Sequence, residues 1–217
     1  MSIIISIEGN IGAGKTTIIN EINKLTFNKS HIIILEQVQE WMNIKDDNDN
    51  NILELFYSDQ QKYGYIFQSY VLFSRLQFML KTIKDNPNSI IICERSHLTD
   101  IKVFAKALFE LGKLSSIEWN VYNKWHKLIQ ELFDIKISGI IYNRCSPSIC
   151  LERICKRSRN GESDITLDYL NLLHNKHEDW MKDLSDIKIL NINGDIDILD
   201  NERNQLLNNI LFFINSL

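Results

Sequence analysis

The sequence lacks any apolar run long enough to span a lipid bilayer, and a short apolar segment follows almost directly after Met1. We therefore expect no membrane partner and no signal peptide. The four cysteines show no C-x-x-C spacing of the zinc or redox kind. They are expected to be small buried side chains in a reducing, cytoplasmic compartment. They are Cys93, Cys145, Cys150 and Cys155.

Positive charge is also too scarce for a nucleic-acid partner, because the formal net charge is −4 and phosphate backbones attract basic surfaces. His174 and His177 form an H-x-x-H pair, but no second ligand pair accompanies them, so an ordinary helix surface is expected. The polar, acidic segment 43–51 lacks the glycine and terminal glutamate of a calcium loop, and it predicts a solvated loop.

The sequence does contain a complete G-x-x-x-x-G-K-[ST] motif at residues 9–16. An Ile-rich run, Ile3–Ile7, precedes it, and residues 17–25 can form a helix, which is the context that a phosphate-binding loop requires. Backbone N–H groups of such a loop surround a polyphosphate, while the lysine reaches the β- and γ-phosphates and the hydroxyl ligates Mg²⁺. The motif predicts binding of ATP or another nucleoside triphosphate by Gly9, Asn10, Ile11, Gly12, Ala13, Gly14, Lys15, Thr16 and Thr17.

Five Ile-rich apolar runs alternate with segments of helical character, which predicts an α/β fold with a parallel sheet between helices. The runs are Ile3–Ile7, Ile32–Leu35, Ile90–Cys93, Gly139–Tyr142 and Ile187–Leu190. Helices are expected over residues 52–84, 100–133 and 148–184. We predict one domain, residues 1–217, with the three-layer fold of phosphate-loop kinases and a five-stranded sheet.

Charged residues follow the second and third runs, at the sheet edge where ligands of parallel sheets bind. Glu36 is a candidate general base for an acceptor hydroxyl, although a solvated strand-end acid explains its position equally well. Glu94 is placed to contact magnesium together with Thr16, and Arg95 to stabilise the transferred phosphoryl group. A small-molecule kinase accounts for this combination.

Three arginines form a basic cluster at Arg153, Arg157 and Arg159. The first two lie four residues apart, hence on one helical face, where like charges repel unless an anion lies between them. A solvated basic face is the usual interpretation. In a chain of negative net charge with a phosphate loop, we favour a lid over residues 153–165 that closes on the triphosphate and excludes water.

Two other classes of phosphate-loop protein lack their signatures here. A regulatory GTPase needs N-K-x-D to read guanine, and the aspartate is missing after both Asn28-Lys29 and Asn123-Lys124. A DNA-dependent motor would be larger and more basic.

An ordered set of motifs across most of the chain resembles the deoxyribonucleoside kinase family, which includes deoxycytidine, deoxyguanosine and insect multisubstrate kinases. The set consists of Gly9–Thr16, Glu36-x-Val38-x-x-Trp41, Tyr57, Phe67-Gln68-x-Tyr70, Arg75, Glu94-Arg95-Ser96, Asp100, and the arginine cluster followed by Leu167-x-Tyr169-Leu170.

The resemblance implies roles for these residues. Glu36 would be the general base on the sugar 5′-hydroxyl, with Arg95 beside it. Gln68 would pair with the base edge, as a planar amide with a donor and an acceptor can. Tyr57 and Glu162 would bind the 3′-hydroxyl of the sugar, and the aromatic rings of Phe67 and Phe104 would enclose the base. Trp41 is a further expected substrate contact.

Arg75 and Asp100 match the charged pair of the deoxycytidine and deoxyguanosine branch, so the resemblance implies deoxycytidine and purine deoxynucleosides in preference to thymidine. It also implies a homodimer. Gln37 replaces the usual proline after the catalytic glutamate. Ser158 and the pair Gly161-Glu162 depart from the usual sequence of the lid.

Two rival functions remain open from the sequence. A deoxynucleoside monophosphate kinase needs another cationic clamp, for which Arg75 could serve. A non-catalytic nucleotide-binding regulator needs no acceptor-activating base, so the presence of both Glu36 and Arg95 disfavours it.

Overall fold

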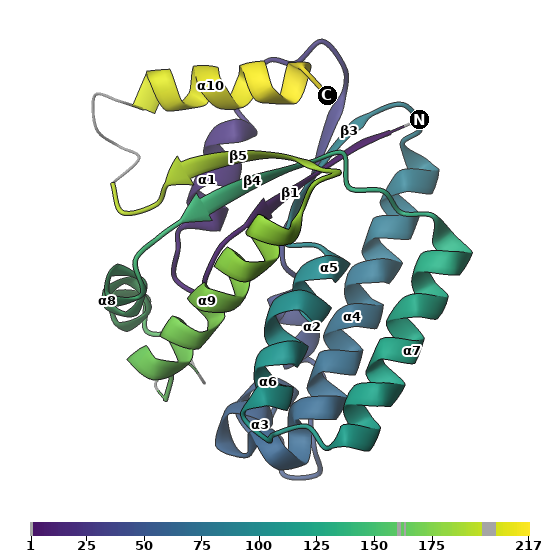
Figure 1. Cartoon of the computed structure of the whole chain (residues 1–217), viewed down its shortest axis with the longest axis vertical. Helices are drawn as coiled ribbons and strands as arrows, with labels where there is room; N and C mark the ends of the chain where they lie inside the picture. Colours follow the sequence, from purple (N-terminus) through teal and green to yellow (C-terminus); the bar gives the residue numbers. More distant parts are fainter. Residues whose placement is uncertain (1, 160–161, 163, 197–202) are drawn as a thin grey trace.

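The computed structural model describes residues 2–159, 162, 164–196 and 203–217. Its centre is a parallel sheet of five strands, as the sequence predicted, and the strand order is β2-β3-β1-β4-β5 (Figure 1). The strands are β1 (Ile3–Glu8), β2 (His31–Ile34), β3 (Ile90–Glu94), β4 (Gly139–Arg144) and β5 (Lys188–Asn193).

The isoleucines of the central strand β1 alternate between two helical layers, as side chains of a strand must. Ile5 and Ile7 pack against α1 (Lys15–Ile22) and α10 (Arg203–Asn215), and these three elements form one apolar cluster. Ile4 faces the opposite layer, which includes α9 (Leu167–Asp183). Figure 1 shows α1 and α10 on one side of the sheet and α9 on the other. Burial on both faces explains why the central strands β1, β3 and β4 read as continuous apolar runs.

A second apolar cluster lies beyond the sheet and unites short and long helices. Its members come from α2 (Val38–Met42), α3 (Ile52–Ser58), α4 (Gln60–Asp85), the π-helical segment η1 (Asp100–Ala105), α6 (Lys106–Glu110) and α7 (Ser116–Phe133). The remaining helices are α5 (His97–Thr99) and α8 (Pro147–Arg157). Figure 1 shows α4, α6 and α7 side by side below the sheet.

Each of the three long helices expected from the sequence is interrupted. Asp59 separates α3 from α4 and caps α4, because its carboxylate accepts hydrogen bonds from the first backbone N–H groups. A turn with Gly112 at φ +67° separates α6 from α7, which begins with a capping box between Ser115 and Glu118. Ser158, in the left-handed conformation, ends α8, and Thr166 caps α9.

Three smaller expectations meet different outcomes. The segment 43–51 is largely exposed, as expected, but its last residue, Asn51, is buried because it caps α3. The expectation of four buried cysteines is wrong for Cys155, which lies on the exposed side of α8. The expectation of a surface H-x-x-H pair is wrong for His177, which is fully buried and stacks on Tyr142. Among the described helices, none combines the length and apolar character needed to cross a membrane.

Candidate active site

The phosphate loop connects β1 to α1, and its glycines allow two neighbouring backbones to approach. A side chain at Gly12, which has φ +77°, would meet the backbone oxygen of Cys150 in α8 at 2.4 Å. One at Gly9 would meet the backbone oxygen of Asn143, at the end of β4, at 2.7 Å. The Asn143 amide donates to the backbone oxygen of Ala13. The loop is thus held in shape by β4 and α8 before any ligand binds.

Lys15 and Thr16 begin α1, directly after the loop. The Lys15 ammonium group is buried and donates to the backbone oxygen of Asn10. Burial, and then the neighbouring Arg95, lower the pKa of Lys15 to about 8. The Thr16 hydroxyl lies 3.1 Å from both carboxylate oxygens of Glu94, at the end of β3. Hydroxyl and carboxylate oxygens are donors that Mg²⁺ prefers, so this pair fits a magnesium site.

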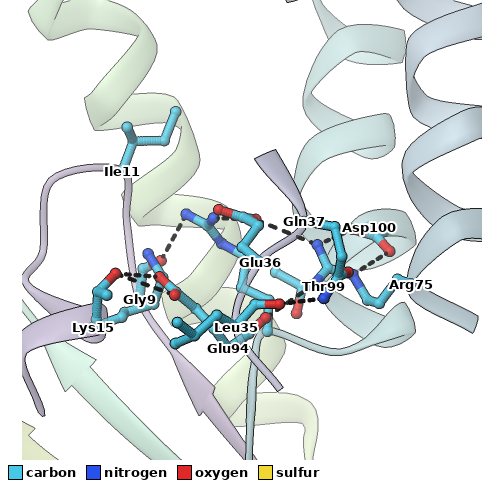
Figure 2. Close-up of polar contacts among 12 residues, drawn as sticks. Gly9, Ile11, Lys15, Leu35, Glu36, Gln37, Arg75, Glu94, Thr99 and Asp100 are labelled. Atoms are coloured by element: carbon cyan, nitrogen blue, oxygen red, sulfur yellow. Dashed lines mark hydrogen bonds and ion pairs between the residues drawn. The ribbon is translucent and has the colours of Figure 1, made fainter. Parts of the chain in front are cut away.

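A chain of alternating charges runs from the strand ends into the second helical cluster (Figure 2). Glu36 lies two residues beyond β2, and its Oε1 is 2.6 Å from Arg95 and 3.3 Å from Arg75. The Arg75 guanidinium also donates to both carboxylate oxygens of Asp100 and to the backbone oxygen of Glu94. Each of these side chains is buried or mostly buried, so breaking one pair would leave an uncompensated charge.

The two arginines keep Glu36 ionised. Burial alone would raise the pKa of Glu36, but Arg95 and Arg75, with a smaller effect from Lys15, lower it to about 2. Burial disfavours the charged form of Arg75 as well and would lower its pKa, but the carboxylates of Asp100 and Glu36 raise it. At neutral pH the site therefore holds a carboxylate that can accept a hydrogen bond or a proton.

The same carboxylate lines a cavity of about 280 Å³ that extends from the phosphate loop to α4. Gln68 lies in the wall of the cavity, buried, and its Oε1 has no hydrogen-bond partner within the described residues. Phe67 stacks on Phe56 with ring centroids 4.5 Å apart, and Trp41 meets Phe67 edge-on. A buried amide with a free acceptor among aromatic rings is suited to a planar, polar ligand.

Residues of the lid expected from the sequence also line this cavity. The Arg157 guanidinium donates to Glu162 at 2.6 and 2.8 Å, and Arg159 donates to the same carboxylate at 3.3 Å. Glu162 and Tyr57 both line the cavity. Residues 160, 161 and 163 of the expected lid, including Gly161, lie outside the described residues.

Most sequence-predicted site residues line this one cavity. They are Ile11, Gly12, Lys15, Thr16, Glu36, Trp41, Tyr57, Phe67, Gln68, Arg75, Glu94, Arg95, Asp100, Phe104, Arg157, Arg159 and Glu162. Ala13, Gly14, Thr17 and Arg153 instead line a smaller neighbouring cavity of about 120 Å³. Arg153 differs from the other two lid arginines, because it donates to the backbone oxygens of Ala13 and Gly194.

Sequence reasoning missed several cavity residues. Phe56 and Leu53 come from α3, and Val71 from α4. Val71 had a readable signal, since it lies three residues after Gln68 and four before Arg75, on the same helical face. Phe56 is adjacent to Tyr57, but its inward direction depends on how α3 packs against α4.

Comparison with known proteins agrees with this geometry. The family model described as deoxynucleoside kinase matches residues 5–215. The chain is 39% identical to a probable deoxycytidine kinase of fowlpox virus, covering 98% of this chain and 88% of that protein. It is 33% identical to deoxycytidine kinase 1 of Xenopus laevis (98% and 91% covered) and 29% identical to a mitochondrial deoxyguanosine kinase of the same species (98% and 90% covered).

Proposed function

The chain belongs to the deoxynucleoside kinase family, and we propose that it transfers the γ-phosphate of ATP, or of another nucleoside triphosphate, to the 5′-hydroxyl of a deoxynucleoside. The observation that carries this proposal is the position of Glu36. Its ionised carboxylate lines one cavity together with Lys15 and Thr16 of the phosphate loop at one end and Gln68 at the other. Phosphoryl transfer to a nucleoside hydroxyl requires a proton acceptor between the phosphate-binding site and the nucleobase-binding site.

The Glu36 carboxylate orients the acceptor hydroxyl and receives its proton. A carboxylate with a pKa of about 2 is a weak base, so positioning of the hydroxyl contributes more than proton affinity. Such a base suits phosphoryl transfer, in which the transition state is loose and nucleophile activation contributes little. Arg95, 2.6 Å from Glu36, lies where it can also stabilise charge on the transferred group.

Thr16 and Glu94 would hold Mg²⁺, since they present three oxygen atoms at the end of β3 and the start of α1. When bound, the ion neutralises charge on the β- and γ-phosphates. Arg157 and Arg159 supply further positive charge from the lid side of the cavity. Their shared partner Glu162, next to Tyr57, is the group we assign to the 3′-hydroxyl of the sugar.

A nucleoside acceptor fits better than a nucleoside monophosphate. A second phosphate would need an uncommitted cation at the acceptor end of the cavity. Arg75, the candidate for this role, uses its guanidinium on Asp100, Glu36 and the backbone of Glu94. The other described cations lining the cavity are already assigned to the triphosphate or the transferred phosphoryl group, and they are Lys15, Arg95, Arg157 and Arg159.

Arg75 and Asp100 favour deoxycytidine and purine deoxynucleosides over thymidine. Both charges are buried and border the cavity, so the thymine methyl group would displace hydration or polar contacts from them. The penalty is on the order of 1–3 kcal/mol.

A homodimer is the proposed assembly. Exposed apolar side chains gather on α4 and α7, where the Phe73 and Trp125 rings meet edge-on at 6.2 Å. Ile117 and Leu132 of α7 are 76% and 65% exposed. Such a surface suits burial against a second copy. Light scattering at two protein concentrations tests this, with Trp125→Glu expected to give a monomer.

The substrate proposal is tested with a panel of the four deoxynucleosides and their monophosphates. Each compound is incubated with the protein, ATP and Mg²⁺, and the release of ADP is measured. Stimulated release with deoxycytidine or a purine deoxynucleoside is expected. Greater stimulation by dCMP than by deoxycytidine would favour the monophosphate kinase, and unstimulated release would favour the regulator.

A further inference from the structure

A buried carboxylate just ahead of the phosphate loop has no role in the mechanism above. Glu8 is the last residue of β1, and its side chain is completely inaccessible. Burial raises the pKa of this carboxyl group, so its contacts must offset a substantial desolvation cost. Within the described part of the chain its hydrogen-bond partners are three hydroxyls, those of Ser6, Ser96 and Thr99.

Two of these hydroxyls belong to the turn that follows β3. The Thr99 hydroxyl lies 2.8 and 2.7 Å from the two oxygens of Glu8, and the Ser96 hydroxyl lies 3.2 Å from one of them. The Thr99 oxygen also accepts a hydrogen bond from the backbone N–H of Ser96 at 3.0 Å. The carboxylate of Glu8 accepts the Thr99 proton while a lone pair of the same hydroxyl accepts the Ser96 N–H, so Glu8 orients Thr99 within the capping box at the start of α5.

The residue immediately before this turn is Arg95, and its backbone is strained. It has φ +62°, a left-handed conformation that costs a non-glycine residue on the order of 1–2 kcal/mol. Its N–H donates to the backbone oxygen of Ile7 at 3.1 Å. From this conformation the guanidinium reaches Glu36 at 2.6 Å and the backbone oxygen of Gly9 at 3.4 Å.

Three consecutive residues at the end of β1 and the start of the phosphate loop thus accept hydrogen bonds from Arg95 and the turn after it. Ile7 accepts from the backbone N–H of Arg95, and Gly9 accepts from its guanidinium. Between them, Glu8 accepts from the hydroxyls of Ser96 and Thr99. The middle contact is the one that fixes the residues directly after the strained position. Without it, the residues after Arg95 lose their contact with β1, and the strained conformation of Arg95 depends on the contacts with Ile7 and Gly9.

We propose that Glu8 is a positioning residue, which acts through Ser96 and Thr99 to hold Arg95 against Glu36 and the phosphate loop. This inference rests on the proposed kinase function. It assigns a catalytic consequence to a carboxylate that touches neither donor nor acceptor. Its signature is a loss of kcat at unchanged nucleoside affinity, because Gln68 and the aromatic rings that would bind the base do not contact Glu8.

The test compares Glu8→Met, which removes the acceptor at similar side-chain length, with Thr99→Val, which removes the donor and guards against misfolding of the first variant. Each is expected to lower kcat at least tenfold, with deoxynucleoside affinity measured by calorimetry within about twofold of wild type. Glu8→Gln retains one acceptor oxygen and is expected to recover part of kcat.

Two controls separate positioning from general destabilisation. Ser6→Ala removes a Glu8 contact that lies on the same strand and does not reach Arg95, and it is expected to keep kcat within about twofold. Ile210→Ala destabilises α10 on the other face of the sheet. Three outcomes would overturn the proposal. Ile210→Ala could lose as much kcat as Glu8→Met at a matched melting temperature, or Glu8→Met and Thr99→Val could lose only nucleoside affinity. Both of these variants could also keep kcat within twofold of wild type.

Hydrogen exchange distinguishes failure of this inference from failure of the proposed function. The amide of Arg95 is followed in the ligand-free protein, so the readout needs no substrate. Exchange at least tenfold faster in Glu8→Met than in Ile210→Ala is expected, even if the wild type phosphorylates no deoxynucleoside. Equal exchange in the two variants would reject the role of Glu8.

Discussion

The Arg75 guanidinium lies 3.3 Å from Glu36 Oε1 while its other nitrogens hold Asp100 and the backbone of Glu94. One side chain therefore connects the residue proposed to select the nucleobase with the proposed general base. Both pairs are buried, where electrostatic interactions are weakly screened. Changes made at the base-selecting pair should consequently reach the chemistry.

Glu36→Gln keeps the shape of the side chain but cannot accept a proton. We expect kcat to fall by about 10²-fold or more, since the carboxylate both orients the acceptor hydroxyl and takes up its proton, and the amide replaces neither charge nor proton acceptor. Deoxynucleoside binding, measured without nucleotide, should persist because Gln68 and the aromatic wall are untouched. Unchanged kcat would move the base to another residue.

Arg75→Met should make catalysis sensitive to mild acid. Removing this cation raises the pKa of Glu36 from its value of about 2 towards the ordinary value of a glutamate. The base acts when ionised, so a higher pKa moves the acid limb of the kcat/KM profile to higher pH. Arg144→Met, at an exposed position on β4, is the matched control. Superimposable profiles from pH 4 to 8 would contradict the electrostatic link.

Arg75→Met combined with Asp100→Ala should shift the kcat/KM ratio towards thymidine, because the charged pair beside the cavity is gone. The structure adds that kcat should fall for every substrate, since Glu36 also loses a partner. Asp100→Ala alone leaves a buried arginine without its bidentate partner, and we expect it to be the least stable of the three variants. Steady-state kinetics with deoxycytidine and thymidine measure the ratio. A constant ratio would refute this model of base selection.

The central strands could be predicted from the sequence because they are buried on both faces and therefore read as Ile-rich runs. The helix interruptions were less accessible, although two carried local signals. Ser115 with Glu118 and the single cap Thr166 mark new helix starts. Helical segments lie on both sides of these caps, so the helices expected from the sequence extend through them.

The site residues could be named from motifs, and the resemblance implied the Arg75–Asp100 pair, but the contact of Arg75 with Glu36 could not be predicted. These two residues are 39 positions apart, so only the packing of α4 against the strand ends brings them together. The burial of His177 was hidden for a similar reason. It depends on which face of α9 meets β4, which the H-x-x-H spacing does not reveal.

Gln68→Leu should weaken deoxynucleoside binding without affecting the triphosphate. The leucine retains the bulk but offers neither donor nor acceptor, and loss of a paired contact costs about 1–3 kcal/mol, or roughly 5- to 150-fold in affinity. Gln77→Leu, exposed on the same helix, is the control. Calorimetric titration with deoxycytidine and with a non-hydrolysable ATP analogue separates the two ligands. Equal affinities for deoxycytidine in the two variants would exclude Gln68 from the base site.

His177→Phe should reduce the sensitivity of folding to acid. Burial lowers the pKa of His177 to about 3, although a hydrogen bond with the backbone of Leu173 opposes the shift. In the unfolded chain this histidine has a pKa near 6.5, so below that pH its imidazole binds a proton in the unfolded chain but not in the folded protein. The histidine therefore makes the free energy of unfolding fall as pH drops from 6.5 towards 3.

For one such histidine the loss between pH 7 and 5 is about 2 kcal/mol. His177→Phe, which retains a ring to stack on Tyr142, should remove this part of the slope whatever its effect at pH 7. Tyr142→Phe keeps the histidine and should keep the wild-type slope. Urea unfolding at pH 5, 6 and 7 measures the dependence. Because buried His97 titrates in the same direction, with its pKa lowered by burial to about 3, a residual slope is expected in His177→Phe. A slope identical to that of the wild type would show that His177 is protonated in the folded protein.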